Sequence, residues 1–191
     1  MAFLDLLRFQ ITTRANFNRL VAVDPETLTD MQHAARFLFL QRCAFGGKVS
    51  GRNCGLSTDR PGRFNLTTLD PDLEALHSRL SGITITCLVF ADFLRRVDRT
   101  DALFYLDPPY WGCESDYGKL LFSRERFEEL AAALAVLKGR FILSLNDVQG
   151  VRKTFAAFLF REVKTTYTIG AKGAAQSVGE VLISNHPLGD I

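Results

Sequence analysis

Hydrophobic residues in the first quarter of the chain recur at steps of three and four positions. From Leu28 to Phe45 this spacing predicts a helix with one apolar face, and the first 20 residues show a shorter version of the pattern. Asp24-Pro25-Glu26 is typical of a helix start, because it combines an N-cap, a proline at the first helical position and an acid in the first turn. We therefore expect residues 1 to about 45 to be helical.

A glycine-rich segment then replaces the periodic pattern. Gly46 to Asn65 contains five glycines, one proline and several Ser, Thr and Asn residues, which is typical of an extended loop. Loops of this length inside compact domains are usually functional or disordered. After this loop, Asp70-Pro71 opens a short helix that continues to Leu80.

From residue 82 onward, short apolar runs alternate with helical patterns. Predicted strands are 83–88, 102–106, 141–145, 163–169 and 178–184, and predicted helices are 123–138 and 151–158. Short apolar strands separated by helices indicate an α/β domain whose sheet is buried on both faces. The last two strands have no room for a helix between them, so we expect them to pair antiparallel.

The composition excludes several classes of protein. The 191 residues are 47% hydrophobic and 23% charged, with a net charge of +2, which indicates a globular domain rather than a disordered, collagen-like or membrane-spanning chain. The four cysteines are widely spaced and include no Cys-x-x-Cys pair, so we expect free thiols in a reducing cytoplasm and no metal site. The 17 Arg against 6 Lys favour planar contacts to phosphate or carboxylate groups.

The most specific chemistry follows the apolar run at 103–106. Asp107-Pro108-Pro109-Tyr110 stands where a buried strand ends, which is where α/β sheets bind ligands. Two successive prolines fix two φ angles and remove two backbone donors, so the segment is stiff and its carbonyl groups are available. A carboxylate, a carbonyl and an aromatic face suit a planar ring that bears an amino group. The alternative is an ordinary Asp-Pro turn beside a packed tyrosine.

This tetrapeptide resembles the Asp/Asn/Ser-Pro-Pro-aromatic signature of the amino-group DNA methyltransferases that use S-adenosylmethionine. More narrowly, the chain resembles the Dam-like class of DNA adenine-N6 methyltransferases, in which the target-recognition segment precedes the signature. The resemblance also rests on residues 40–47, 63–65, 87–93, 144–147 and 180–185.

The resemblance implies an α/β fold with a partial Rossmann-like methyltransferase sheet and a C-terminal antiparallel hairpin. A mostly helical target-recognition insertion, which includes the glycine-rich loop, would occupy residues 1–81. The catalytic α/β portion would occupy residues 82–191.

The implied reaction moves a methyl group from S-adenosylmethionine to the exocyclic amino group of an adenine flipped out of DNA, in the manner of prokaryotic or phage restriction–modification enzymes. Tyr110 would stack on the flipped base. Asp107 and the Pro108 carbonyl would accept the amino hydrogens, on a bend that Pro109 stiffens. Such a step depends on positioning and electrostatics and needs no covalent intermediate.

DNA is the implied partner, and the loop described above supplies positive charge for it. Between Gln41 and Thr67 the chain has five cations and one acid, a net +4 that exceeds the +2 of the whole chain. The predicted phosphate contacts are Arg42, Lys48, Arg52, Arg60 and Arg63. The alternative is a solvated, glycine-rich surface loop.

The implied cofactor contacts are Phe90, Asp92 and Asp107. The family also has a Phe-x-Gly-x-Gly turn after a first strand, and we find no such turn in this sequence. We therefore expect weak binding of S-adenosylmethionine by this chain alone. Two functions remain open. The first is an adenine-N6 methyltransferase, as a fragment, a truncated gene product or the second half of a split enzyme with a separate N-terminal half. The second is a remnant that only binds DNA or has no activity.

Overall fold

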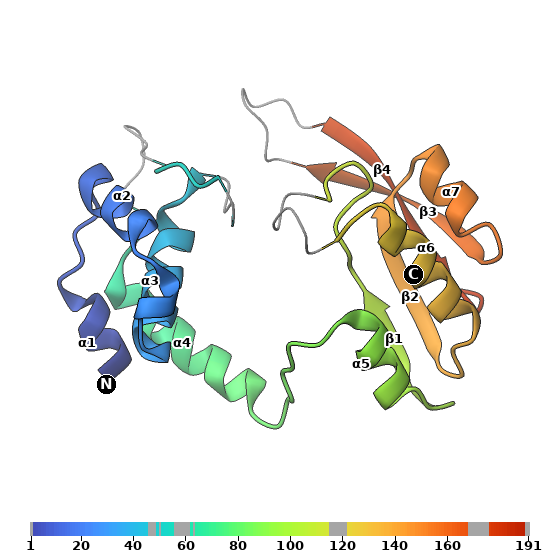
Figure 1. Cartoon of the computed structure of the whole chain (residues 1–191), viewed down its shortest axis with the longest axis horizontal. Coiled ribbons are helices and arrows are strands. Elements are labelled where there is room, and N and C mark those ends of the chain that lie inside the picture. The colour runs from blue at the N-terminus through green and yellow to red at the C-terminus, as the bar shows by residue number, and fades with distance from the viewer. Residues whose placement is uncertain are drawn as a thin grey trace. The chain divides into compact units, whose positions relative to one another are not determined.

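The computed structural model divides the chain into two compact units, residues 1–85 and 86–191. Figure 1 shows their helices and strands. The structure describes residues 2–45, 49, 51–55, 62, 64–114, 122–167 and 176–189. Within these residues it contains seven α-helices and one mixed sheet of four strands, which is an α/β architecture. No helix among them is both long and apolar enough to cross a membrane.

The first unit is helical and has its own core. Its helices are α1 (Ala2–Arg8), α2 (Arg14–Ala22), the short 3₁₀ helix η1 (Pro25–Thr27), α3 (Asp30–Cys43) and α4 (Leu66–Leu80). Each α-helix contributes an almost completely buried side chain: Leu7, Phe17, Phe39 and Leu69. The prediction of helices in the first 45 residues is confirmed.

The start of α3 differs from the prediction. Asp24 caps only η1, whereas α3 begins at Asp30, after an N-cap at Thr29. The Thr29 hydroxyl accepts a hydrogen bond from the Gln32 N–H, and the Gln32 side chain accepts one from the Thr29 N–H. This reciprocal capping box satisfies two backbone donors, while Asp24 satisfies one. The stronger cap therefore defines the long helix.

The start of α4 also lies earlier than predicted. The helix begins at Leu66, because the Asn65 side chain accepts a hydrogen bond from the Thr67 N–H at 3.0 Å. Pro71, predicted near the first helical position, lies inside the helix. Because proline has no N–H, one hydrogen bond of the helix is missing at this position, yet α4 continues to Leu80.

The second unit is built on a sheet with the strand order β1-β2-β4-β3. Its strands are β1 (Leu103–Leu106), β2 (Arg140–Asn146), β3 (Leu159–Tyr167) and β4 (Gln176–Ser184), and its helices are α5 (Phe90–Val97), α6 (Glu125–Ala135) and α7 (Gln149–Thr154). β1 and β2 are parallel, while β4 is antiparallel to β2 and β3. The antiparallel pairing predicted for the last two strands is confirmed, and the turn between them lies outside the described residues.

The helices of this unit pack on one face of the sheet (Figure 1). Successive side chains of a strand point to opposite faces, so alternate residues meet the helices. The strand residues buried in this core are Phe104, Phe141, Leu143, Leu145, Val181 and Ile183. On the opposite face of β1, Leu103 and Tyr105 are 64% and 67% exposed. The prediction of burial on both faces is therefore wrong for β1.

One predicted strand is absent. Residues 83–89 are exposed and form no helix or strand, with Ile83 and Ile85 58% and 74% exposed. β-Branched residues favour a strand only where neighbouring strands supply packing and hydrogen bonds, and no strand of the described residues pairs with this segment. The division between the two units falls inside it. The roles assigned to residues 1–81 and 82–191 stay predictions.

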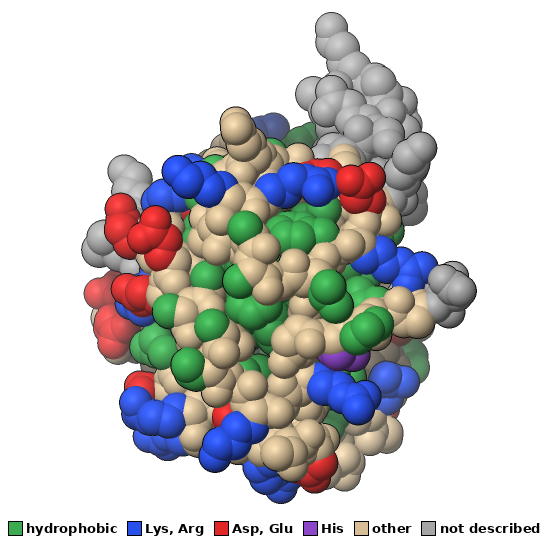
Figure 2. Space-filling model, turned by 90° about the vertical axis from the view of Figure 1, so that its right-hand side faces the viewer, with side chains coloured by type: hydrophobic (Ala, Val, Ile, Leu, Met, Phe, Trp, Pro, Cys, Tyr) green, Lys and Arg blue, Asp and Glu red, His purple; other side chains and the backbone are tan. Residues whose placement is uncertain are grey.

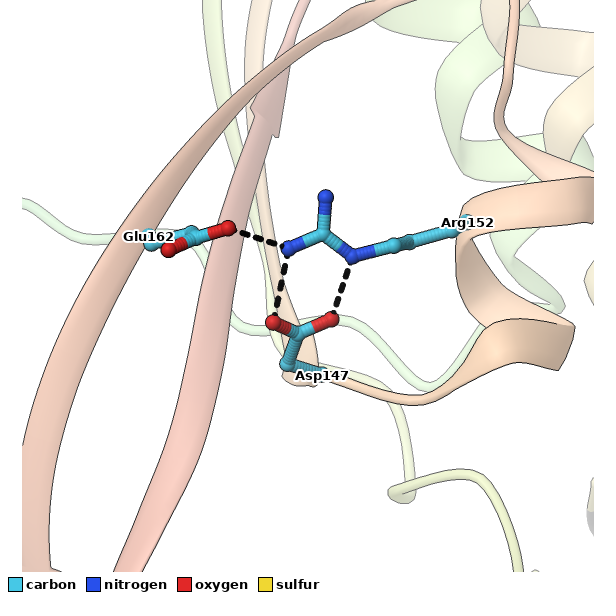
Figure 3. A network of polar contacts seen from close by, with 3 residues as sticks. All are labelled: Asp147, Arg152 and Glu162. Atoms are coloured by element: carbon cyan, nitrogen blue, oxygen red, sulfur yellow. Dashed lines mark hydrogen bonds and ion pairs between the residues drawn. The ribbon is translucent and has the colours of Figure 1, made fainter.

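The surface of the second unit carries charges of both signs. Figure 2 shows a face on which apolar side chains occupy the middle and Lys, Arg, Asp and Glu side chains lie around them. One ordered group on the unit ties α7 to the sheet (Figure 3). Arg152 donates hydrogen bonds of 2.6 and 2.7 Å to the two Asp147 oxygens, and its Nη2 also donates to Glu162 at 2.6 Å.

Removing this group should produce a pH-dependent loss of stability. Hydrogen bonds from Arg152 hold the pKa of Asp147 below its ordinary value. A depressed pKa in the folded state stabilises the fold above the unfolded carboxyl pKa of about 3.9, and the effect is lost as pH falls through the folded-state value. We expect Arg152→Met to lower the Tm near neutral pH and to converge with the wild-type Tm in acid. Equal Tm values at neutral pH would contradict this, and calorimetric melts across the pH range measure it.

Candidate active site

The candidate active site lies at the edge of the sheet where β1 and β2 end. These strands are parallel, so their carboxyl ends lie at the same edge. β1 ends at Leu106 and leads directly into Asp107-Pro108-Pro109-Tyr110, while β2 ends at Asn146. Asp107 is exposed, and the next three residues are partly buried. The predicted catalytic segment therefore stands at the position at which sheets of this kind bind ligands.

A tight turn follows the two prolines. The Cys113 N–H donates to the Tyr110 carbonyl at 2.8 Å, and Gly112 has a φ of 93°. A type II turn requires a positive φ at its third position, which glycine adopts without steric cost. Residues 107–113, here called the site loop, thus leave β1 through a stiff bend and then reverse direction.

Two polar side chains bind the site loop to the sheet. The Asn146 Oδ1 accepts a hydrogen bond from the Trp111 N–H at 2.8 Å, and the Asn146 Nδ2 donates to the Trp111 carbonyl at 3.0 Å. Glu180 lies directly opposite Asn146 on β4 and accepts a hydrogen bond from the Tyr110 hydroxyl. Two consecutive residues of the loop are therefore attached to two adjacent strands.

The Trp111 side chain anchors the same loop by packing. The Arg124 guanidinium lies 4.1 Å from the centroid of the indole, and the Phe127 ring lies 4.9 Å from it at an interplanar angle of 36°. Gly150 of α7 faces the indole so closely that a Cβ there would lie 2.2 Å from the Trp111 Cζ2. Glycine at position 150 is therefore what allows the indole to occupy this place.

A cavity of about 900 Å³ opens beside the site loop, within the second unit. This volume lies in the range of small-molecule sites. Apolar and aromatic side chains make up most of its lining, including Phe90 and Phe122, and Asp107 and Pro108 contribute the end that adjoins the loop. The rings of Phe90 and Phe122 lie 6.2 Å apart, and Phe127 lies 4.9 Å beyond Phe122, so an aromatic row connects the cavity with the ring that packs on Trp111.

The structure brings together some of the predicted site residues. Asp107, Pro108 and Phe90 share the cavity. Asp92 lies on α5 outside the cavity lining, and its carboxylate pairs with Arg95 at 2.7 Å. Tyr110, bonded to Glu180, also lies outside the lining, as does Pro109. The roles of these residues in binding and catalysis stay predictions.

The predicted DNA contacts belong to the first unit and are described in part. Arg42, in the last turn of α3, lies 3.4 Å from the Asp72 carboxylate. The Arg52 guanidinium lies over the Phe37 ring, 5.6 Å from its centroid. Arg42 is exposed, and Arg52 is partly buried. Three further predicted contacts lie outside the described residues: Lys48, Arg60 and Arg63.

Within the described part of the chain, no group of His, Cys, Asp and Glu residues is placed to hold a metal ion. Burial, and secondarily the nearby Cys54, raise the pKa of the Cys43 thiol to about 11. This thiol is therefore protonated at neutral pH, whereas metal binding and nucleophilic attack need the thiolate.

The residues that fix the site loop were not predicted from the sequence: Asn146, Glu180, Trp111 and Gly150. A signal for Asn146 was present, since it is a polar residue at the end of an apolar strand, and the ends of neighbouring parallel strands meet at one edge. Glu180 opens the segment 180–185 that carries the resemblance, but its contact with the loop was not predictable, because its strand is antiparallel and its register with β2 is a tertiary property.

Residues 8–169 match the family model of the D12 class N6 adenine-specific DNA methyltransferases. The chain belongs to this family. The predicted membership of the adenine-N6 DNA methyltransferases is therefore confirmed, and with it the enzyme class. This methyltransferase is also similar to the type II methyltransferase M.CviBI of Paramecium bursaria Chlorella virus NC1A. The two share 20% identity over 186 residues, which cover 97% of this chain and 70% of the viral protein.

Proposed function

We propose that the chain transfers the methyl group of S-adenosylmethionine to the exocyclic N6 of an adenine that has been flipped out of DNA. The position of Asp107 carries this proposal. Asp107 directly follows the carboxyl end of β1 and lines the cavity together with Phe90. It is also the first residue of the site loop, which Asn146 attaches to the sheet. Membership of the adenine-specific family supports the choice of substrate.

In this proposal, each residue of the tetrapeptide has one role. The Asp107 carboxylate and the Pro108 carbonyl accept the two amino hydrogens, which localises the nitrogen lone pair and directs it at the methyl carbon. The Tyr110 ring stacks on the extruded base, while Pro109 keeps the bend rigid. The new N–C bond forms as the S–C bond breaks, the sulfur keeps the electron pair of that bond and becomes a neutral thioether, and the nitrogen releases one proton to the solvent. Such catalysis relies on orientation and on electrostatics.

The cavity beside Asp107 suits the cofactor. Phe90 offers an aromatic wall for its adenine, and the negative charge of Asp107 complements the positive charge of a sulfonium group. Asp92 is proposed as a further contact from α5. When bound, S-adenosylmethionine supplies a methyl group activated for displacement.

Transfer of a labelled methyl group tests the proposed function. The chain is incubated with S-adenosylmethionine labelled on its methyl group and unmethylated duplex DNA of mixed sequence, and the DNA is then digested to nucleosides. We expect the label in N6-methyladenine. Label in a methylated cytosine would contradict the proposed substrate.

We further propose that the basic loop, taken together with the flanking ends of α3 and α4 as residues 41–67, contacts DNA phosphates. Each phosphate contact that is lost should reduce the slope of log K against log salt by about one. Arg52→Gln is therefore expected to flatten the salt dependence of DNA binding by about one. Arg79→Gln on α4, outside the loop, is the matched control. Fluorescence anisotropy with labelled duplex DNA measures both slopes, and an unchanged slope for Arg52→Gln would contradict a phosphate contact.

A second candidate function is that of a half-enzyme that binds DNA and methylates it only with a separate N-terminal half. The free edge of β1 favours it. The Arg140 N–H donates to the Ala102 carbonyl at 2.9 Å, so alternate residues of β1 face β2, and the backbone groups of Leu103 and Tyr105 point to the other edge. Among the described residues no strand pairs with that edge. An unpaired strand edge beside exposed apolar side chains can be covered by a strand from another chain, and a separate N-terminal half could supply such a strand here.

The two candidates differ in what the chain does alone. The half-enzyme predicts DNA binding without methylation, and no heat of S-adenosylmethionine binding at micromolar concentrations in calorimetry. Methylation of DNA by the chain alone would exclude the half-enzyme.

A further inference from the structure

We infer that Asn146 and Glu180 are positioning residues that hold the site loop in the geometry needed for methyl transfer. This inference rests on the proposed function, because it concerns the same reaction. It comes from three hydrogen bonds that join two consecutive loop residues, Tyr110 and Trp111, to two adjacent strands, at the end of β2 and in the middle of β4.

The site loop needs such anchors because of its own sequence. Pro108 and Pro109 have no backbone N–H, so the two residues that follow Asp107 cannot donate to a neighbouring strand. Where the chain leaves a sheet, its buried backbone N–H and carbonyl groups need hydrogen-bond partners other than a neighbouring strand. The first residue whose N–H and carbonyl both have side-chain partners is Trp111, and both partners are atoms of Asn146. Asn146 thus continues the pairing of β1 with β2 beyond the last backbone pair.

Only an amide of this size can make both bonds. The Asn146 side chain donates from Nδ2 and accepts at Oδ1. Aspartate at this position would accept but not donate, and leucine, of similar shape, would do neither. The pair of bonds therefore fixes the path of the backbone at Trp111 as well as its distance from β2.

Glu180 controls a different degree of freedom. Its carboxylate holds the hydroxyl at the far end of the Tyr110 ring, so it sets the orientation of that ring. Glu180 and Asn146 are directly opposed on β4 and β2, and their side chains lie on the same face of the sheet. One residue thus fixes the backbone of the loop, and the other fixes the ring that stacks on the base.

Loss of either anchor should lower the rate of transfer rather than the binding of the cofactor. A displacement of reacting groups by about 1 Å costs on the order of a hundredfold in rate. Most of the cavity wall comes from α5, β1 and the segment before α5, the site loop contributes only Asp107 and Pro108 at one end, and neither Asn146 nor Glu180 belongs to the lining. We therefore expect kcat to fall while KM for S-adenosylmethionine stays within about twofold.

Asn146→Asp and Asn146→Leu test the backbone anchor. We expect each to reduce kcat by about ten- to a hundredfold. The chain has a single tryptophan, Trp111, so fluorescence excited selectively at tryptophan reports on the site loop. In the absence of DNA and cofactor, acrylamide should quench this fluorescence more strongly in both variants than in the wild type. Wild-type kcat together with wild-type quenching would overturn the role of Asn146.

A double-mutant cycle tests the ring anchor. Glu180→Met should lower kcat about tenfold, whereas Glu180→Gln, whose amide oxygen still accepts from the Tyr110 hydroxyl, should restore most of it. In a Tyr110→Phe background, which has no hydroxyl, Glu180→Met should cost nothing further. An equal loss in both backgrounds would show that Glu180 acts through something other than Tyr110, and would overturn this role.

Failure of the inference is distinguishable from failure of the proposed function. If Asp107→Ala abolishes transfer but the Asn146 and Glu180 variants are as fast as the wild type, the function stands and the positioning roles fall. If Asp107→Ala leaves transfer intact, the proposed catalytic site fails, and the anchoring roles fall with it. If the wild-type chain places the label in a methylated cytosine, the proposed function itself fails.

Discussion

Asp107→Ala is expected to reduce methyl transfer by about a hundred- to a thousandfold while leaving DNA binding unchanged. The proposed role of Asp107 is to accept an amino hydrogen and orient the nitrogen lone pair in the transition state. Removing one preorganised hydrogen-bonding group of this kind typically costs two to three orders of magnitude in rate. The Asp107 side chain is exposed and supports no core contact, so its loss should not unfold the chain. Labelled methyl transfer and an anisotropy assay with duplex DNA give the two readouts.

Asp107→Asn is the matched variant for this prediction. It keeps a carbonyl oxygen that can accept the amino hydrogen and removes only the negative charge. We expect it to retain measurable transfer, well above that of Asp107→Ala. Transfer by Asp107→Ala at the wild-type rate would remove the tetrapeptide from the reaction. Equal and complete loss in both variants would show that charge, rather than hydrogen-bond acceptance, is what the site requires.

Gly150→Ala should destabilise the chain by about 1–3 kcal/mol, although alanine is the better helix former. A Cβ at position 150 would lie 2.2 Å from the Trp111 Cζ2 and 2.3 Å from its Cε2, which is far inside van der Waals contact. The indole cannot retreat freely, because Arg124 and Phe127 pack against it. Overpacking of this kind forces side chains from their rotamers and shifts the backbone. Urea denaturation followed by circular dichroism measures the change in the free energy of unfolding.

The same substitution should also be visible in the site loop. A displaced indole changes the emission maximum of the single tryptophan, and the loop that carries it moves with it. Gly189→Ala is the control, because a Cβ there would meet no atom within 4 Å. If Gly150→Ala is as stable as the wild type and its emission is unchanged, Trp111 does not occupy this place in solution.

The fold was predictable where local signals and tertiary packing agree. Strand β2 and helix α6 each combine a clear hydrophobic period with a fully buried apolar face, so their periods alone located them. The segment 83–88 has the β-branched residues of a strand but no strand among the described residues pairs with it, and propensity is a weak signal without pairing. The helix starts were displaced because several capping residues compete within a few positions, and their relative strength depends on side-chain geometry.

The candidate site was predictable in part for a similar reason. Asp107-Pro108-Pro109-Tyr110 is one continuous segment, and its stiffness and its place after a strand follow from local sequence. Asn146 and Glu180 are 35 and 70 residues away from their partners, so only the register of β2 and β4 brings them to the loop. Gly150 has no positive φ, and nothing in the local sequence distinguishes it from other glycines. A glycine is needed there only because the Trp111 indole faces it.

The exposed connector between α4 and α5 has an evolutionary consequence. Its residues form no strand or helix, and each of the two buried cores draws its side chains from one side of it only. Recombination at this joint would join two halves of different origin without disturbing either core. A lineage could in this way acquire a new first unit while the site loop of the second unit stays unchanged. Substitutions in one unit would then need no compensating substitutions in the core of the other.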